Sequence, residues 1–436
     1  MRITRLEAKN IGPFENLNID FKPKPAGMEN KAEIHILTGE NGTGKSTILM
    51  MLASCADFDN DDRIRDRHNK VWEPIKRKSH RIIFSSSVYS LFYNVGENKD
   101  ERFIPHELKK IEGTDEYSVS GKNQFRFNRI KSNKMILSAF FGYSSYRATQ
   151  GNGIINIKEI TSNPLENAVN FEKSIDSDLI LDWVANVKTK ELIARGKGNY
   201  VGNYKSAVQK IEKAISEIID KEIEFDLEES LKVTLKINNK NLPFDVLPDG
   251  LKSIISWLSD LLMRLDRIDW ADKTRSILEQ NFILFLDEIE VHLHPSWQRK
   301  ILPVVQDLFP NAQIFISTHS PFVVGSVDGA RVYKFKLDEN NNSYLDSEYW
   351  TEDGNSYDRI LEEIFDIKER FGVGVQKQLE EFKSYKNKVM VGESIDNEAF
   401  MSLANDIAKQ SIELNGIISF ELRQLKKNTA HILETA

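Results

Sequence analysis

Cysteine is nearly absent from this chain, and so are the segments that mark secreted and membrane proteins. The 436 residues include a single cysteine, Cys55, which excludes a disulfide framework and a cysteine-based zinc site. No stretch approaches the roughly 20 consecutive apolar residues that a membrane-spanning helix needs. The first residues, Met1–Glu7, lack the apolar core of a signal peptide. These absences predict a cytoplasmic protein without a membrane partner.

An excess of positive charge is also missing. The chain has 59 Lys and Arg against 66 Asp and Glu, a net charge of −7, so its surface as a whole is unsuited to coating nucleic acid. Contact with DNA or RNA would have to come from a local patch, such as Arg63–Arg81 or the surroundings of Arg126–Arg129. Acidic residues are interspersed in the first of these, as in a solvated charged face. Nucleic-acid binding is therefore left open.

What the chain does contain is a phosphate-binding loop. The segment Gly39–Thr47 reads G-x-x-x-x-G-K-S-T, after an apolar run, Glu33–Thr38, and before a helix-forming run, Thr47–Ala53. Glycines let the backbone curl so that its N–H groups point at phosphate oxygens, and the helix N-terminus adds a favourable dipole. The residues expected to bind nucleotide are Gly39, Glu40, Asn41, Gly42, Thr43, Gly44, Lys45, Ser46 and Thr47.

Two side chains of this loop carry its chemistry. The Lys45 ammonium can reach the β- and γ-phosphates, and the Ser46 hydroxyl can take one position on Mg²⁺. ATP and Mg²⁺ are thus the expected cofactors.

An apolar strand that ends in two acids supplies the second half of the expected site. Phe282–Leu286 is followed by Asp287 and Glu288. A strand buried in a parallel sheet presents its C-terminal end to the ligand crevice. We expect Asp287 to hold Mg²⁺, directly or through water, and Glu288 to orient and polarise the attacking water. A further strand, Gln313–Ser317, ends at His319, which could contact the γ-phosphate.

Together these motifs resemble the ABC-type ATPases of the SMC/RecF/OLD group. The resemblance rests on Arg2–Asn10, Gly39–Thr47, Leu286–Pro295 and Ser317–Pro321, and spans roughly residues 1–330. It implies an α/β fold: an ABC-type P-loop ATPase head with mixed β-sheets and a helical lobe, followed by a C-terminal helical tail. It also implies that Asp287 is the Walker B magnesium residue, Glu288 the catalytic base and His319 the switch histidine.

The same resemblance implies a signature motif at Leu247–Ser253. Its Gly250 would contact the nucleotide of a second protomer, so that a head-to-tail homodimer encloses two ATP molecules. Pro248 replaces the usual serine; either Lys252, Ser253 or backbone N–H groups compensate, or hydrolysis is weak. The Q-loop is expected within Gly142–Arg147, where no glutamine stands, so Gln150 or Arg147 would serve.

Two other patterns have ordinary explanations. His292 and His294 could suggest a metal site, but the resemblance places them in the D-loop and no third ligand is evident. Lys388–Asp396 is similar to the opening of a TOPRIM nuclease, but Glu393 is misplaced after Gly392 and no D-x-D follows. No nuclease of its own is therefore expected.

The expected organisation is an ATPase head over 1–350 and a helical region over 351–436. The head would comprise halves at about 1–150 and 240–350, separated by an insertion or helical lobe at about 151–240. A strand is expected at Met135–Phe141, and helices at about 176–195, 203–220 and 250–265.

The tail contains Ser356–Phe365, then paired charged helices, the last of them at Phe420–Lys427. In this it is similar to the tails of the ATPase subunits of Septu and retron-associated Septu-like antiphage systems. This similarity implies a partner nuclease of HNH type and, in some systems, a retron reverse transcriptase with its RNA–DNA product.

Three functions remain open at this point. The first is an ATPase subunit of a defence complex that controls a partner nuclease through ATP-dependent dimerisation. The second is a stand-alone RecF-like ATPase of DNA repair or recombination, which predicts DNA-stimulated hydrolysis without a partner. The third is an interaction scaffold that ATP stabilises and that hardly hydrolyses it, as Pro248 would favour.

Overall fold

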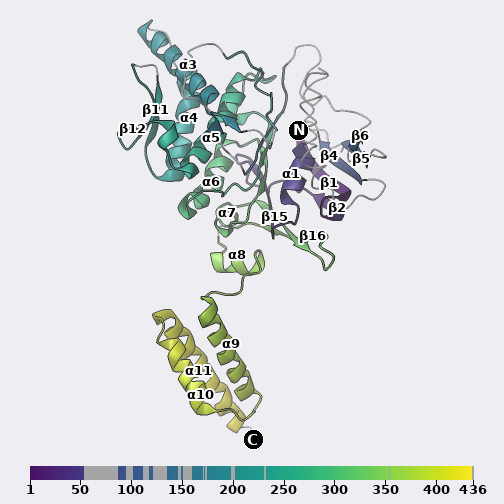
Figure 1. The fold of residues 1–436 in the computed structure, drawn as a ribbon, viewed down its shortest axis with the longest axis vertical. Helices are drawn as coiled ribbons and strands as arrows, with labels where there is room; N and C mark the ends of the chain where they lie inside the picture. The colour runs from purple at the N-terminus through teal and green to yellow at the C-terminus, as the bar shows by residue number, and fades with distance from the viewer. Residues whose placement is uncertain are drawn as a thin grey trace. The chain divides into compact units, whose positions relative to one another are not determined.

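The computed structural model describes two compact units, Met1–Ile360 and Leu361–Ala436 (Figure 1). The first carries all the nucleotide-site motifs, and we call it the head; we call the second the C-terminal unit. The described residues are 1–53, 87–94, 102–110, 117–120, 135–145, 149–150, 160–169, 171, 174–197, 202–229, 232–352 and 354–434.

A six-stranded sheet forms the centre of the head, in the order β16-β15-β3-β14-β13-β7. The strands from β15 to β7 run parallel, and β16 pairs antiparallel with β15. Their bounds are β3 Glu33–Gly39, β7 Ala139–Tyr143, β13 Phe282–Leu286, β14 Gln313–Ser317, β15 Arg331–Leu337 and β16 Ser343–Trp350. This is the mixed α/β architecture that the sequence predicts.

Continuous apolar runs explain the parallel core of this sheet. Every residue of β13 and β14 is buried, as expected for parallel strands covered on both faces. In the register, Leu286 pairs with Ile316, and Ser317 pairs with Leu37. The C-terminal ends of β3, β13 and β14 therefore lie side by side at one edge, where the phosphate loop, the acidic pair and His319 follow.

A second, antiparallel sheet has the order β2-β1-β4-β5-β6. Its strands are β1 Arg2–Ile11, β2 Phe14–Asp20, β4 Ser87–Asn94, β5 Arg102–Lys110 and β6 Tyr117–Ser120. Side chains of β1 alternate toward a core that is shared with helix α1 (Lys45–Ala53) and the central sheet. At the junction, the Phe21 ring meets Phe315 edge to face with centroids 4.9 Å apart.

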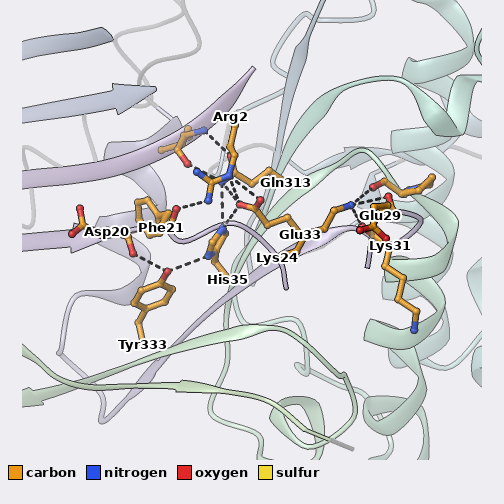
Figure 2. A network of polar contacts seen from close by, with 12 residues as sticks. Arg2, Asp20, Phe21, Lys24, Glu29, Lys31, Glu33, His35, Gln313 and Tyr333 are labelled. Carbon is orange, nitrogen blue, oxygen red and sulfur yellow. Dashed lines mark hydrogen bonds and ion pairs between the residues drawn. The ribbon is translucent and has the colours of Figure 1, made fainter. Parts of the chain in front are cut away.

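A buried polar network joins the two sheets (Figure 2). Arg2 Nε donates to Glu33 at 2.8 Å, and Gln313 Nε2 donates to the same carboxylate at 2.8 Å. His35 Nε2 lies 2.7 Å from Glu33 Oε1, and His35 Nδ1 lies 3.2 Å from the Tyr333 hydroxyl. Burial alone would raise the pKa of Glu33, but the contacts with His35 and Arg2 lower that pKa to about 2. Burial lowers the pKa of His35, and the contact with Glu33 opposes this effect.

A helical lobe lies between the two halves of the nucleotide motifs in sequence. Its helices are α3 Ser177–Gly196, α4 Gly202–Ile219 and α5 Asp249–Arg267, with short parallel strands β8 Thr149–Gln150 and β9 Ile175–Asp176, and a sheet of β10 Ile223–Leu227, β11 Val233–Ile237 and β12 Lys240–Leu242. Single 3₁₀ turns, η2 Phe244–Val246 and η3 Ile277–Glu279, flank α5. Helix α4 buries an apolar stripe that includes Ile211, Ile215 and Ile218. These helices lie within about three residues of their predicted bounds.

The strand predicted at Met135–Phe141 is displaced. The observed strand β7 begins at Ala139 and extends to Tyr143, because its ladder with β13 pairs Phe282 with Ala139 and Leu286 with Tyr143. The β15–β16 hairpin is not predicted from the sequence. Its outer strand is mostly half-exposed and lacks a continuous apolar run.

The end of the head lies beyond residue 350. Helix α8 (Tyr357–Glu363) starts on the head, where the Tyr357 ring contacts Phe322 at 5.2 Å and Arg299 lies over it. These contacts keep the segment up to Ile360 with the first unit.

The C-terminal unit is a bundle of three helices, α9 Val373–Met390, α10 Asn397–Ala408 and α11 Ile412–Glu434. Its small core includes Leu379, Phe382, Phe400, Ile407 and Ile418. The Phe382 and Phe400 rings stack with centroids 5.1 Å apart. Among the described residues, none of the helices combines the length and the apolar character that crossing a bilayer requires.

Candidate nucleotide site

The phosphate loop connects β3 to α1 through three glycines with positive φ angles. The angles are 142° at Gly39, 88° at Gly42 and 84° at Gly44, a region that L side chains rarely adopt. Packing imposes a second requirement, because a Cβ at Gly39 would lie 2.3 Å from the Phe335 carbonyl oxygen and one at Gly44 would lie 2.6 Å from the Phe14 ring. At Gly42 a Cβ would meet nothing within 4 Å, so the loop is open at this point.

Lys45 lies folded into its own loop. Its Nζ donates to the carbonyl oxygens of Gly39 at 3.0 Å and Glu40 at 2.9 Å. Burial lowers the pKa of Lys45 to about 8, although Asp287, Glu288 and Glu290 act in the opposite direction. The ammonium is thus partly desolvated and surrounded by acids, an environment in which added phosphate charge would be favourable.

Ser46 and Asp287 meet although 241 positions separate them in the chain. Ser46 Oγ donates to Asp287 Oδ1 at 3.0 Å, and Asp287 is 6% exposed. A hydroxyl and a carboxylate oxygen this close are two hard ligands of the kind that Mg²⁺ prefers. The donor set therefore fits magnesium held together with a nucleotide.

Glu288 and His319 follow Asp287 and Ser317 at the same sheet edge. Glu288 has a left-handed backbone, with φ at 47°, and its N–H donates to Ser317 Oγ at 2.8 Å. The His319 ring is half-buried; burial lowers its pKa and the nearby Lys45 lowers it further, so the ring is neutral near pH 7. A carboxylate and a neutral imidazole next to a phosphate loop can accept and donate hydrogen bonds to a reacting water and phosphate.

Two further polar residues lie at this edge, which the sequence includes only as members of longer motifs: Glu290 opens the expected D-loop, Glu290–Pro295, and Ser317 opens Ser317–Pro321. Ser317 is fully buried, and its hydroxyl also donates to Asp287 Oδ1. Glu290 accepts a hydrogen bond from the His319 N–H at 2.6 Å. The sequence signal that could have indicated Ser317 is a serine at the end of an apolar strand.

The structure gives Gly250 a role within its own chain. A Cβ at this position would lie 2.3 Å from the His292 carbonyl oxygen, so glycine is required for α5 to approach the following loop. The proline before α5 offers no side-chain cap. Lys252 Nζ donates to the Asp245 carbonyl oxygen at 2.6 Å, and Ser253 is 5% exposed. Both side-chain substitutes for the missing serine are therefore engaged or buried, which leaves compensation by backbone N–H groups or weak hydrolysis as predictions.

His294 caps helix α6 (Pro295–Leu308). Its Nδ1 lies 2.7 Å from Ser296 Oγ and accepts from the Ser296 N–H. This capping role accounts for a histidine before Pro295 without a metal ion.

The remaining candidates lie outside the described residues. They are Arg147, the side chain of Gln150, the basic segment Arg63–Arg81 and Arg126–Arg129. Their expected roles in a Q-loop or in nucleic-acid binding stay predictions.

Comparison with known families defines the class. Residues 34–325 match the family model described as "AAA domain, putative AbiEii toxin, Type IV TA system", and the chain belongs to this ATPase family. Residues 1–56 also match a model described as "AAA domain".

Individual relatives refine this class. The chain is 24% identical to the retron Vc95 probable ATPase of Vibrio cholerae, over 69% of this chain and 70% of that protein. It is 27% identical to the Septu protein PtuA of Bacillus thuringiensis, over 30% of this chain and 34% of that protein. The solved SMC head domain from Thermotoga maritima aligns with 81% of the chain at 14% identity and a TM-score of 0.42. The resemblance to Septu and retron ATPases is confirmed.

Proposed function

We propose that the chain is the ATP-binding and ATP-hydrolysing subunit of a bacterial antiphage defence complex. The observation that carries the enzymatic part is the contact between Ser46 and Asp287, at 3.0 Å, beside Glu288 and His319 at one sheet edge. Belonging to an ATPase family and similarity to retron and Septu ATPases support the cellular role. In this proposal the protein acts in the cytoplasm.

Each residue of the site has a distinct task. The N–H groups of Gly39–Thr47 cradle the β- and γ-phosphates, and Lys45 leaves its loop carbonyls to pair with them. Ser46 and Asp287 would hold Mg²⁺, which when bound would neutralise charge on the phosphates. Glu288 accepts a proton from the attacking water, and His319 donates a hydrogen bond toward the γ-phosphate.

Dimerisation completes the site in this proposal. The start of α5, at Gly250, faces the nucleotide of a second protomer, so ATP binding closes a head-to-tail homodimer and hydrolysis reopens it. The changing geometry controls a partner nuclease, of HNH type, and in a retron system the reverse transcriptase with its RNA–DNA product. Co-expression with the product of the neighbouring gene tests the choice of partner.

The variant Glu288→Gln tests the hydrolytic role. Loss of the proton acceptor should lower the turnover number by about a hundredfold or more while ATP still binds. Light scattering should then detect an ATP-dependent dimer that persists, whereas the wild-type dimer decays as phosphate is released. The exposed Glu339→Gln, on the turn after β15, is the matched control. Normal turnover in Glu288→Gln would remove the role assigned to this residue.

A low-turnover switch is the second candidate, and the start of α5 favours it. The signature position lacks a side-chain cap, while Lys252 and Ser253 are engaged within the chain. A steady-state phosphate-release assay separates the two readings: brisk turnover rules out the switch, and slow turnover with tight ATP binding supports it.

A further inference from the structure

Hydrogen bonds from two side chains join the segment that follows β13 to the end of β14, and the sequence motifs assign neither side chain a role of its own. Ser317, at the end of β14, contacts the acidic pair after β13. Glu290, after β13, contacts the backbone of the switch histidine after β14. Each segment thus contributes one side chain that forms hydrogen bonds with the other segment.

Ser317 uses its hydroxyl twice. The group donates to Asp287 Oδ1 and accepts from the Glu288 N–H at 2.8 Å, and Ser317 is 0% exposed. The hydrogen bond that Ser317 accepts fixes the backbone of Glu288. The φ of Glu288, 47°, is unfavourable for a residue that carries a side chain. Ser317 therefore holds the turn that sets the direction of the Glu288 side chain, and it orients the carboxylate that contacts Ser46.

Glu290 makes the reciprocal contact. Its Oε1 accepts from the His319 N–H at 2.6 Å, a charge-assisted bond to the backbone of the proposed switch histidine. Its Oε2 is buried and has no hydrogen-bond partner among the described residues. A carboxylate held in this way has few alternative positions, so it fixes the His319 backbone relative to Asp287 and Glu288.

We propose that Ser317 and Glu290 are positioning residues, which together form a clasp that keeps Glu288 and His319 at a fixed separation across the nucleotide site. This inference rests on the proposed ATPase function. In this proposal Glu288 and His319 move as one unit, because the two loops cannot separate without breaking the hydrogen bonds of both Ser317 and Glu290.

Ser317→Ala, made in the whole chain, tests the hydrogen bonds of Ser317. We expect the turnover number to fall by about tenfold to a hundredfold, as is typical when a residue behind a metal ligand is lost. Calorimetric ADP titrations should show that the Mg²⁺-dependent gain in ADP affinity shrinks severalfold. ADP affinity in EDTA should stay within about twofold of wild type, because the phosphate loop is intact. Ser317→Thr keeps the hydroxyl and should restore most of the Mg²⁺-dependent gain.

Ser216→Ala is the matched control. Its hydroxyl also donates once and accepts once, to the Glu212 carbonyl oxygen and from the Ile223 N–H, but in α4 of the helical lobe. This variant should lose thermal stability without a change in turnover or in the Mg²⁺ dependence of ADP binding.

Glu290 is tested by comparing Glu290→Gln with Glu290→Ala. The amide oxygen of Gln can still accept from the His319 N–H, so the Gln variant should retain most of the turnover that the Ala variant loses. If the clasp acts as a unit, the double variant Ser317→Ala/Glu290→Ala should be less impaired than the product of the two single losses.

The results separate the clasp from the function on which it rests. If the wild type releases no phosphate, the proposed hydrolysis fails, and the Mg²⁺-dependent ADP affinity alone judges the clasp. An unchanged Ser317→Ala variant, or one whose ADP binding in EDTA falls together with turnover, would overturn the clasp. Strictly multiplicative losses in the double variant would also overturn it.

Discussion

The head and the C-terminal unit are built on opposite principles. In the head, polar residues from distant parts of the chain meet at the end of a buried parallel sheet, so chemistry depends on tertiary contacts such as Ser46 with Asp287. In the C-terminal unit, three consecutive helices pack through a small apolar core, and the nucleotide motifs are absent from it. The residues of the candidate nucleotide site therefore all belong to the head, whereas the C-terminal unit has a small apolar core of its own.

Tryptophan offers a direct way to observe the two units separately. All six tryptophans precede residue 351, so their fluorescence reports on the head alone, while circular dichroism at 222 nm also reports on the bundle.

Phe400→Ala should break the bundle and spare the head. Phe400 is 4% exposed and stacks on Phe382, and removing such a ring costs about 3–5 kcal/mol. We expect a low-temperature transition in circular dichroism that has no counterpart in tryptophan fluorescence, with ATP affinity unchanged. Phe420→Ala, at a ring 58% exposed in α11, is the control and should change stability by less than about 0.5 kcal/mol. A fluorescence shift in Phe400→Ala would show that the units are not separable.

Acid should unfold the head through the Glu33 network. Because the pKa of Glu33 is lowered to about 2, its ionised form stabilises the folded head above pH 4.5, and this contribution is lost as the pH falls toward 2. The contribution is about 3 kcal/mol. The lowered pKa of His35 acts in the same direction, with stability falling as the pH drops below about 6.5.

Urea titrations followed by tryptophan fluorescence, from pH 7 to pH 3, measure this dependence. Glu33→Gln cannot ionise, so its free energy of unfolding should start lower and change less between pH 5 and pH 3. Equal slopes in the variant and the wild type would contradict the assignment to Glu33.

Lys45→Ala should affect only the nucleotide function of the head. Losing a charged donor to phosphate should weaken ATP binding by about tenfold to a hundredfold, measured by calorimetry. Lys300→Ala removes a lysine from α6, where it pairs with Asp220, and should leave ATP affinity unchanged. Bundle stability should be the same in both variants.

Lys386→Ala should produce the smallest change. Lys386 pairs with Glu421 between α9 and α11, and both side chains are partly exposed. Such pairs contribute less than about 1 kcal/mol, so the bundle transition in circular dichroism should shift only slightly. Lys388→Ala, on an exposed position of α9, is the control. A loss comparable to that of Phe400→Ala would mean that charge rather than the apolar core holds the bundle.

The elements predicted from sequence are those whose cause is local. The runs Phe282–Leu286 and Gln313–Ser317 are strands with the predicted bounds, because buried parallel strands need continuous apolar residues. The outer strand β16 has no such run, and it forms because β15 supplies a pairing edge. The strand near Met135 is displaced for the same reason, since pairing with β13 sets its register.

In the candidate site, local sequence is enough to predict the phosphate loop and the two acids that follow β13. A cradle of N–H groups requires glycines at fixed spacing, and the acids stand at the end of an apolar strand. Tertiary structure alone decided which groups meet: Ser46 with Asp287, Gly250 with the His292 carbonyl, and Ser317 with Glu288. The physical reason is that hydrogen bonds between loops depend on positions set by the whole sheet, which no local pattern encodes.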